Sequence, residues 1–157
     1  MYGTYPKGTY KEHSMNILFV CTGNTCRSPM AAYMFDRIAT EMNLDVRVES
    51  AGVFAVEGEG SSSEAIIVMK KYGVDMLSHH SQPINTELLE KSDLILTMTE
   101  GHKMLLSEYA GDKTYTLSEF AGEDGDIPDP YGGDVKEYEE CAERLNFLLK
   151  KVAEKLK

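Results

Sequence analysis

The most reactive stretch of the chain begins with a cysteine and closes with an arginine six positions later. Residues 21–29 read Cys-Thr-Gly-Asn-Thr-Cys-Arg-Ser-Pro. Arg27 carries a planar, permanently charged fork that can hold two phosphoryl oxygens. Cys21 can attack phosphorus as a thiolate. Because the stretch lacks the Gly-Lys-Ser/Thr ending of a nucleotide P-loop, it predicts a phosphate-binding loop with a nucleophile and does not indicate ATP or Mg²⁺.

A strand before this loop and a helix after it would have to position it. Residues 16–20 form an apolar run behind one polar residue, which is typical of a buried strand. Pro29 suits the first turn of a helix, and we expect Ser28 to act as its cap. The loop would then lie where backbone N–H groups and the helix dipole favour an anion, including the thiolate of Cys21.

The residues inside the loop fit this geometry. Gly23 allows a tight turn, and Asn24 tolerates a left-handed backbone better than most residues. Ser28 could also donate a hydrogen bond to the sulfur of Cys21. The residues predicted to bind phosphate or to support the loop are Thr22, Gly23, Asn24, Thr25, Cys26 and Ser28. The alternative is a buried structural cysteine beside a salt-bridged arginine, and the strand–loop–helix context favours the functional interpretation.

A second chemical element lies in the acidic loop at residues 121–133. Pro128 and Pro130 flank Asp129 and restrict the backbone on both sides of it, which would hold its carboxyl group in one direction. Displacement of a phosphate ester or amide needs a proton donor, and the same group can then act as a base toward water. Tyr131 could form a wall of the pocket. Asp-Pro is also a common turn former, so the catalytic interpretation depends on the presence of Cys21 and Arg27.

Length and composition point to one ordinary domain. The chain has 157 residues, three cysteines and a formal charge of -10. It contains no apolar run of the ~18 residues needed to span a membrane and no secretory apolar segment. Unpaired cysteines fit a reducing compartment, and the acidic charge disfavours nucleic acid. We expect a cytoplasmic monomer with neither a membrane nor a nucleic acid as partner.

Strand and helix patterns alternate along the rest of the chain. The fold predicted is a single doubly wound α/β domain with a four-stranded parallel sheet and helices on both faces. Further strands are expected at residues 46–50, 94–98 and 114–117, and helices at 63–72, 86–91 (capped by Thr86), 100–109 and 135–156.

The first 14 residues do not share these patterns, because their Gly, Pro, Thr and Tyr residues follow no period. We predict that residues 1–14 are a disordered extension or leader and that residues 15–157 form the domain. A short arm packed on the domain is the alternative.

Taken together, the segments 21–29 and 129–131 resemble the low-molecular-weight protein phosphatase family, and the resemblance covers residues 15–157. It implies Cys21 as nucleophile, Arg27 as phosphoryl clamp and Asp129 as general acid. It also implies Ser28 as support for the thiolate and Asn24 as the strained loop residue. The implied substrates are phosphorylated proteins, the product is inorganic phosphate, and the reaction needs neither a metal nor a cofactor.

The resemblance extends to residues around the loop. Family members carry Ser-Ala-Gly after the second strand, here starting at Ser50, and a histidine that looks like His79 rather than His80. Both would belong to a hydrogen-bond network around the loop asparagine, whereas the alternative for either histidine is a solvated loop residue. The family also implies a reversible disulfide between Cys21 and Cys26 that protects the nucleophile.

Within the family, Thr25 suggests the branch. Tyrosine-specific members usually carry a bulky aliphatic residue at this position, whereas Thr25 and the Asp-Pro-Tyr-Gly-Gly segment look like the bacterial protein-arginine phosphatases. A hydroxyl at the loop rim can hydrogen-bond near the attacked phosphorus or its water, and such complementarity discriminates steeply. We therefore expect hydrolysis of phosphoarginine through a phosphocysteine intermediate, with Thr25 and Tyr131 setting specificity. The alternative is that Thr25 is neutral and the protein is a tyrosine phosphatase.

Two further functions remain as alternatives. An arsenate reductase would need additional cysteines to relay a disulfide, and only Cys141 remains, on the apolar stripe of the last helix. A non-catalytic phospho-residue binder would not need Asp129, because a carboxylate near a dianion weakens binding unless it is protonated.

Overall fold

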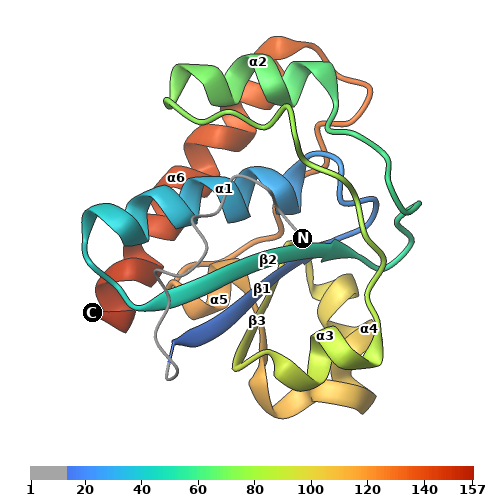
Figure 1. The fold of residues 1–157 in the computed structure, drawn as a ribbon, viewed down its shortest axis with the longest axis vertical. Coiled ribbons are helices and arrows are strands. Elements are labelled where there is room, and N and C mark those ends of the chain that lie inside the picture. The colour runs from blue at the N-terminus through green and yellow to red at the C-terminus, as the bar shows by residue number, and fades with distance from the viewer. Residues whose placement is uncertain (1–13) are drawn as a thin grey trace.

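The computed structural model describes residues 14–157, and its centre is an all-parallel sheet of four strands in the order β2-β1-β3-β4 (Figure 1). This confirms the predicted α/β fold. The sheet consists of β1 (Met15–Cys21), β2 (Val46–Gly52), β3 (Leu94–Thr97) and β4 (Thr114–Thr116). β1 lies between β2 and β3, so both of its edges are hydrogen-bonded, and its alternate side chains are buried in the cores on the two faces of the sheet, as its continuous apolar run predicts.

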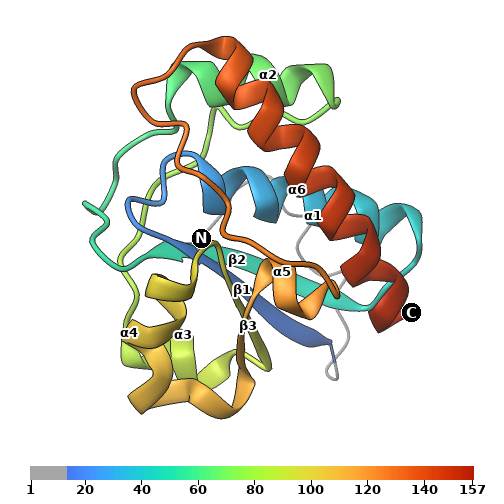
Figure 2. The same ribbon diagram turned by 180° about the vertical axis from the view of Figure 1, so that it is seen from behind.

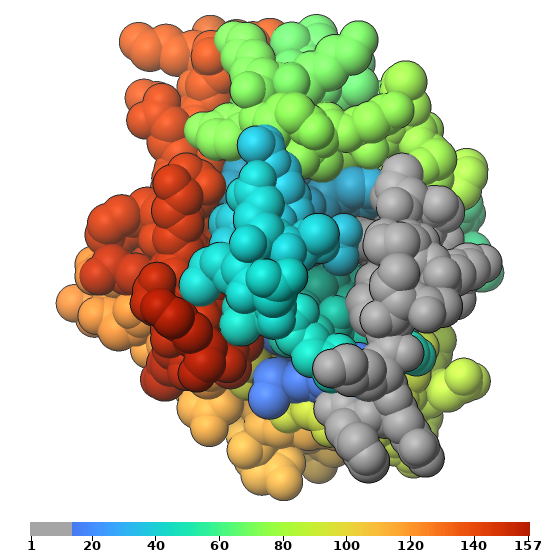
Figure 3. All heavy atoms as spheres, turned by 60° about the vertical axis from the view of Figure 1, so that its left-hand side comes forward, coloured from blue at the N-terminus to red at the C-terminus, as the bar shows by residue number. Residues whose placement is uncertain are grey.

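Helices cover both faces of the sheet, as expected (Figures 1 and 2). One face packs against α1 (Arg27–Glu41) and α6 (Val135–Leu156), and α2 (Ser63–Lys71) packs on these two helices. The other face packs against α3 (Thr86–Lys91) and α4 (Glu100–Ala110). The remaining turns are η1 (Gly111–Lys113) and the short helix α5 (Leu117–Phe120). Figure 3 shows α1 at the surface beside α6, which it contacts.

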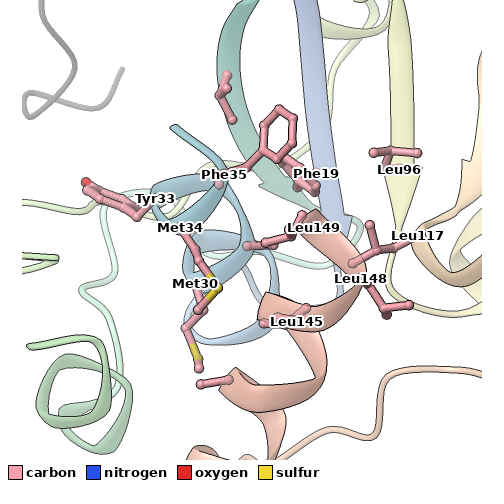
Figure 4. Close-up of a cluster of buried hydrophobic side chains, with 14 of the residues drawn as sticks. Phe19, Met30, Tyr33, Met34, Phe35, Leu96, Leu117, Leu145, Leu148 and Leu149 are labelled. Atoms are coloured by element: carbon pink, nitrogen blue, oxygen red, sulfur yellow. The ribbon is translucent and has the colours of Figure 1, made fainter. Parts of the chain in front are cut away.

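The larger core lies between the sheet and α1 and α6. Phe19 of β1 is fully buried against Phe35 of α1, with ring centroids 5.8 Å apart. Leu145, Leu148 and Leu149 of α6 close this core from outside (Figure 4). Burial of each such side chain stabilises the fold by roughly 1.5–3 kcal/mol. This packing fixes β1 relative to α1 and therefore fixes the loop between them.

Several element ends differ from the sequence-based expectations. Ser28 does not cap α1, because the N-cap is Cys26 and the hydroxyl of Ser28 contacts Cys21 and Asn24 instead. Thr86 is not the cap of α3, since the side chain of Asn85 accepts from the Leu88 N–H and Thr86 is already helical. β2 continues through Gly52, which lies opposite Cys21.

The C-terminal end of β4 also differs. Leu117 was expected in this strand but begins α5, because Thr116 and Glu119 form a capping box in which each side chain satisfies the other's backbone N–H.

Two further expectations concern the N-terminal residues and membrane-spanning helices. The predicted N-terminal extension lies outside the described residues except for Ser14, whose hydroxyl donates to Asp45 Oδ1 at 2.6 Å. Across residues 14–157, no helix combines the length and the apolarity that crossing a bilayer demands.

Candidate active site

A pocket of about 210 Å³ opens at the carboxyl edge of the sheet, where β1 ends and α1 begins. Residues of the segment 21–29 and of the acidic loop 121–133 line it together, as expected from the parallel topology. The lining residues are Cys21, Thr22, Gly23, Thr25, Cys26, Arg27, Glu59, Asp129 and Tyr131. The structure therefore brings together the cysteine, the arginine and the aspartate that the sequence singled out.

The sulfur of Cys21 lies at the base of this pocket and has two potential donors. Ser28 Oγ is 2.9 Å from the sulfur, and the backbone N–H of Asn24 points to it at 3.3 Å. Cys21 is only 2% exposed. Hydrogen bonds to a charged group are stronger than those to a neutral one, and both of these groups can donate to sulfur that carries charge during the reaction.

Asn24 holds the loop in shape through its side chain. Its φ of 57° is left-handed, and the residue is fully buried. The amide nitrogen donates to Ser28 Oγ and to Ser50 Oγ, both at 2.8 Å. The amide oxygen accepts from the backbone N–H of Gln82 at 3.0 Å. A strained residue persists only where its surroundings over-determine it, and these bonds do so here.

The carbonyl of Asn24 is held from the segment after α2. His79 Nε2 lies 2.7 Å from it, and Ser81 Oγ donates to it at 2.7 Å. Burial lowers the pKa of His79 to about 4, so the ring is neutral and donates through Nε2. His80 is exposed and lies near Gly58 O, outside this network. His79 is thus the histidine that reaches the loop.

Within residues 14–157, the guanidinium of Arg27 makes polar contacts through both terminal nitrogens but none through Nε. Nη1 donates to the carbonyl of Ile127 at 3.0 Å, and Nη2 contacts Thr22 Oγ1 and Asp129 Oδ2, each at 3.4 Å. The buried Nε has no hydrogen-bond partner among the described residues. An unpaired buried donor is costly, so this edge of the guanidinium fits an anion such as a phosphoryl group.

Asp129 lies at the mouth of the pocket, with its side chain 48% exposed. Its Oδ1 accepts from the backbone N–H of Tyr131 at 3.1 Å, which orients the carboxyl group. The thiol of Cys26 lies 3.6 Å from the same oxygen. Burial raises the pKa of Cys26 to about 12, and nearby Cys21 and Asp129 add to the shift, so Cys26 stays protonated. Tyr131 is 72% exposed at the rim.

Several residues at this site were not anticipated from the sequence. Ser81 and Gln82 lie in a polar segment without periodicity, which was the one available signal that they do something other than fill a core. Glu59 lines the pocket from a Gly- and Ser-rich loop. His102 contacts Thr22, and no motif pointed to it.

Across the part of the chain that the structure describes, no cluster of three or more histidine, cysteine, aspartate or glutamate side chains could hold a metal ion.

A buried cysteine at the end of a parallel strand, in one pocket with an arginine and a carboxylate, is the arrangement of a cysteine-dependent phosphatase. The chain belongs to the low molecular weight phosphotyrosine protein phosphatase family, whose profile matches residues 16–157. Both the resemblance stated from the sequence and the enzyme class are thereby confirmed.

Relatives carry two different substrate names. A protein-arginine-phosphatase of Bacillus subtilis is 42% identical over 147 residues, which cover 91% of this chain and 97% of the relative. The low molecular weight protein tyrosine phosphatase of T. tengcongensis has a solved structure that is 46% identical, with a TM-score of 0.87 and coverage of 90% and 99%. A YwlE arginine phosphatase mutant, with serine for the active-site cysteine and that serine phosphorylated, is 40% identical, with a TM-score of 0.87 and coverage of 90% and 95%.

Proposed function

We propose that this protein hydrolyses phosphoarginine on proteins through a phosphocysteine intermediate. The Cys21 thiolate attacks phosphorus in line, while Arg27 and the N–H groups of the loop hold the equatorial oxygens. Asp129 protonates the leaving nitrogen and then removes a proton from the water that attacks the phosphocysteine. Ser28 stabilises the sulfur as nucleophile and as leaving group, and Asn24, Ser50 and His79 keep the loop in shape.

Three features of the pocket support this reaction scheme. Two groups that can donate lie at the sulfur of Cys21, the unpaired edge of Arg27 fits phosphoryl oxygens, and Asp129 is oriented at the mouth by the Tyr131 N–H. The phosphorylated serine in the YwlE mutant is what a covalent step at that position would leave behind.

The arginine preference rests on one observation, which is that Thr25 lines the pocket. A polar group at this position can bond to the phosphoryl group or to the attacking water, whereas an aliphatic side chain would pack beside an aryl ring. Hydrogen-bond complementarity discriminates between substrates more steeply than apolar fit. The identities to arginine- and tyrosine-named relatives are similar, so the substrate has to be argued from this pocket.

The test compares kcat/KM for one peptide carrying phosphoarginine and one carrying phosphotyrosine. The wild type should prefer phosphoarginine, and Thr25→Ile should shift the preference toward phosphotyrosine by about 10-fold or more. Thr25→Val keeps the shape but removes the hydroxyl, and Thr25→Ser keeps the hydroxyl. If Thr25→Ser behaves like Thr25→Val, or if the wild type prefers phosphotyrosine, the proposed substrate is wrong.

A tyrosine phosphatase is the second candidate, favoured by the exposed ring of Tyr131 at the rim, which could stack on an aryl group. An arsenate reductase has less support. It would need Cys141 as a relay, and that thiol is buried, which raises its pKa to about 12.

We further propose that the protein works as a monomer in the cytoplasm. All three cysteines are free in the structure, which fits a reducing compartment where the thiolate of Cys21 survives.

A further inference from the structure

His102 contacts the phosphate-binding loop from α4, through the side chain of Thr22. The histidine is buried, and its Nε2 lies 2.9 Å from Thr22 Oγ1. Its other ring nitrogen, Nδ1, lies 3.0 Å from the hydroxyl of Thr99, the N-cap of α4. Thr22 Oγ1 also accepts from Nη2 of Arg27 at 3.4 Å. A continuous chain of polar contacts therefore runs from the cap of α4 to the proposed phosphoryl clamp.

The ring of His102 is neutral near pH 7. Burial lowers its pKa to about 4, and the charge of Arg27 adds to this shift, while Asp126 and Asp129 oppose it. A neutral imidazole has one nitrogen that donates and one that accepts. The hydroxyls of Thr22 and Thr99 must therefore play opposite roles toward the ring.

Two arrangements satisfy these contacts. In the first, the Thr99 hydroxyl donates to Nδ1 and Nε2–H donates to Thr22. The hydroxyl of Thr22 can then donate its own hydrogen bond to a ligand in the pocket. In the second, Nδ1–H donates to Thr99 and the Thr22 hydroxyl donates to Nε2. Only lone pairs of Thr22 then face the pocket. A phosphoryl dianion repels those lone pairs and attracts the proton, so a bound substrate selects the first arrangement.

We propose that His102 is a positioning residue that turns the Thr22 hydroxyl toward the bound phosphoryl group. Thr22 then donates to an equatorial phosphoryl oxygen and, by accepting from Nη2, holds Arg27 against the same group. Thr22 is exposed and lines the pocket, so its hydroxyl is within the space that a phosphoryl group would enter. The inference rests on the proposed attack of Cys21 on phosphorus but not on which residue carried the phosphoryl group.

The test is a double-mutant cycle between Thr22→Val and His102→Ala. It uses p-nitrophenyl phosphate, and because every variant keeps Thr25, the preference for arginine or tyrosine substrates does not enter the comparison. Each single variant should lower kcat/KM by about 10- to 100-fold, as expected for loss of one hydrogen bond to a charged group. The double variant should lose no more than the worse single variant, because His102 acts through Thr22. Inorganic phosphate, titrated by calorimetry, should bind more weakly to both single variants.

His102→Gln is the conservative variant, since its amide N–H can replace Nε2–H, and it should recover most of the lost activity. His80→Gln, at an exposed histidine, should match the wild type. Full activity of Thr22→Val, or losses that multiply in the double variant, would overturn the inference. Wild-type protein that binds phosphate more tightly than Thr22→Val but turns over no phosphorylated substrate would instead contradict the proposed hydrolysis. If His102→Ala does not fold, Thr22→Val and His102→Gln still decide the question.

Discussion

The guanidinium of Arg27 and the carboxylate of Asp129 pair with each other, with Nη2 and Oδ2 3.4 Å apart. Arg27 is nearly buried, whereas Asp129 is half exposed, so the contact is partly screened by solvent and contributes little to stability. Its consequence is chemical. The same Nη2 group must donate to the oxygens of an incoming phosphoryl group. An ionised carboxylate beside that dianion weakens its binding.

Replacing Asp129 should therefore separate binding from catalysis. In Asp129→Asn the proton donor is lost, and kcat should fall by about 10²- to 10⁴-fold. Inorganic phosphate should bind more tightly, because Arg27 is no longer shared with a negative charge. Steady-state kinetics and calorimetric titration of phosphate measure the two effects. Asp124→Asn, at an exposed residue of the same loop, is the matched control. Weaker phosphate binding by Asp129→Asn would contradict this account of the pair.

The covalent step can be tested by replacing the nucleophile. Cys21→Ser should lose turnover, because an alkoxide is a poorer nucleophile and leaving group than a thiolate, but it should still bind phosphate through Arg27 and the loop. Incubation with a phosphorylated substrate should leave one phosphoryl group on the introduced serine, measurable by intact-protein mass spectrometry and peptide mapping. Cys26→Ser should carry no such group at position 26. Substantial turnover by Cys21→Ser would rule out the phosphocysteine intermediate.

The sheet and its long helices were predictable from local patterns. The apolar run of β1 and the apolar stripe of α6 indicate which side chains of these elements are buried. The alternation of strands with helices predicts a parallel sheet. The meeting of Cys21 with Asp129 also follows, because parallel strands place their carboxyl ends at one edge.

Contacts between distant loops were not predictable, because they depend on how segments without periodicity pack. Ser28 looked like a helix cap, yet its hydroxyl is used by Cys21 and Asn24. Asn85 rather than Thr86 caps α3, an ambiguity of one position between two residues that can both cap. The contact of His102 with Thr22 joins α4 to a loop far away in sequence, and no local pattern encodes it.

The two neighbouring cysteines of the loop should protect the nucleophile from irreversible oxidation. After mild treatment with peroxide, wild-type activity should return on addition of a dithiol, because a disulfide between Cys21 and Cys26 would form before further oxidation. Cys26→Ser should lose activity irreversibly. Cys141→Ser should behave like the wild type, since Cys141 is packed in the core. Equal recovery of Cys26→Ser and wild type would argue against a protective disulfide.

Buried histidines should make the stability of the fold depend on pH. Burial lowers the pKa values of His79 and His102 from 6.5 to about 4. The unfolded chain therefore takes up these protons at a higher pH than the folded protein. Their stabilising contribution is fully present above pH 6.5 and is lost as the pH falls toward 4, by up to roughly 3 kcal/mol per histidine.

Asp36 opposes this trend over part of the same range. Burial raises its pKa from 3.8 to about 6, so the folded protein binds this proton first and gains stability as the pH falls between those values. Two histidines outweigh one half-buried carboxyl group, so the free energy of unfolding should decrease from about pH 7 to about pH 5. Urea denaturation across this range measures the slope. His79→Gln should flatten it, whereas His80→Gln should change it far less, because His80 is exposed and adds only a minor part of the shift of the His79 pKa. A slope that His79→Gln does not alter would mean that this histidine is not held neutral by the fold.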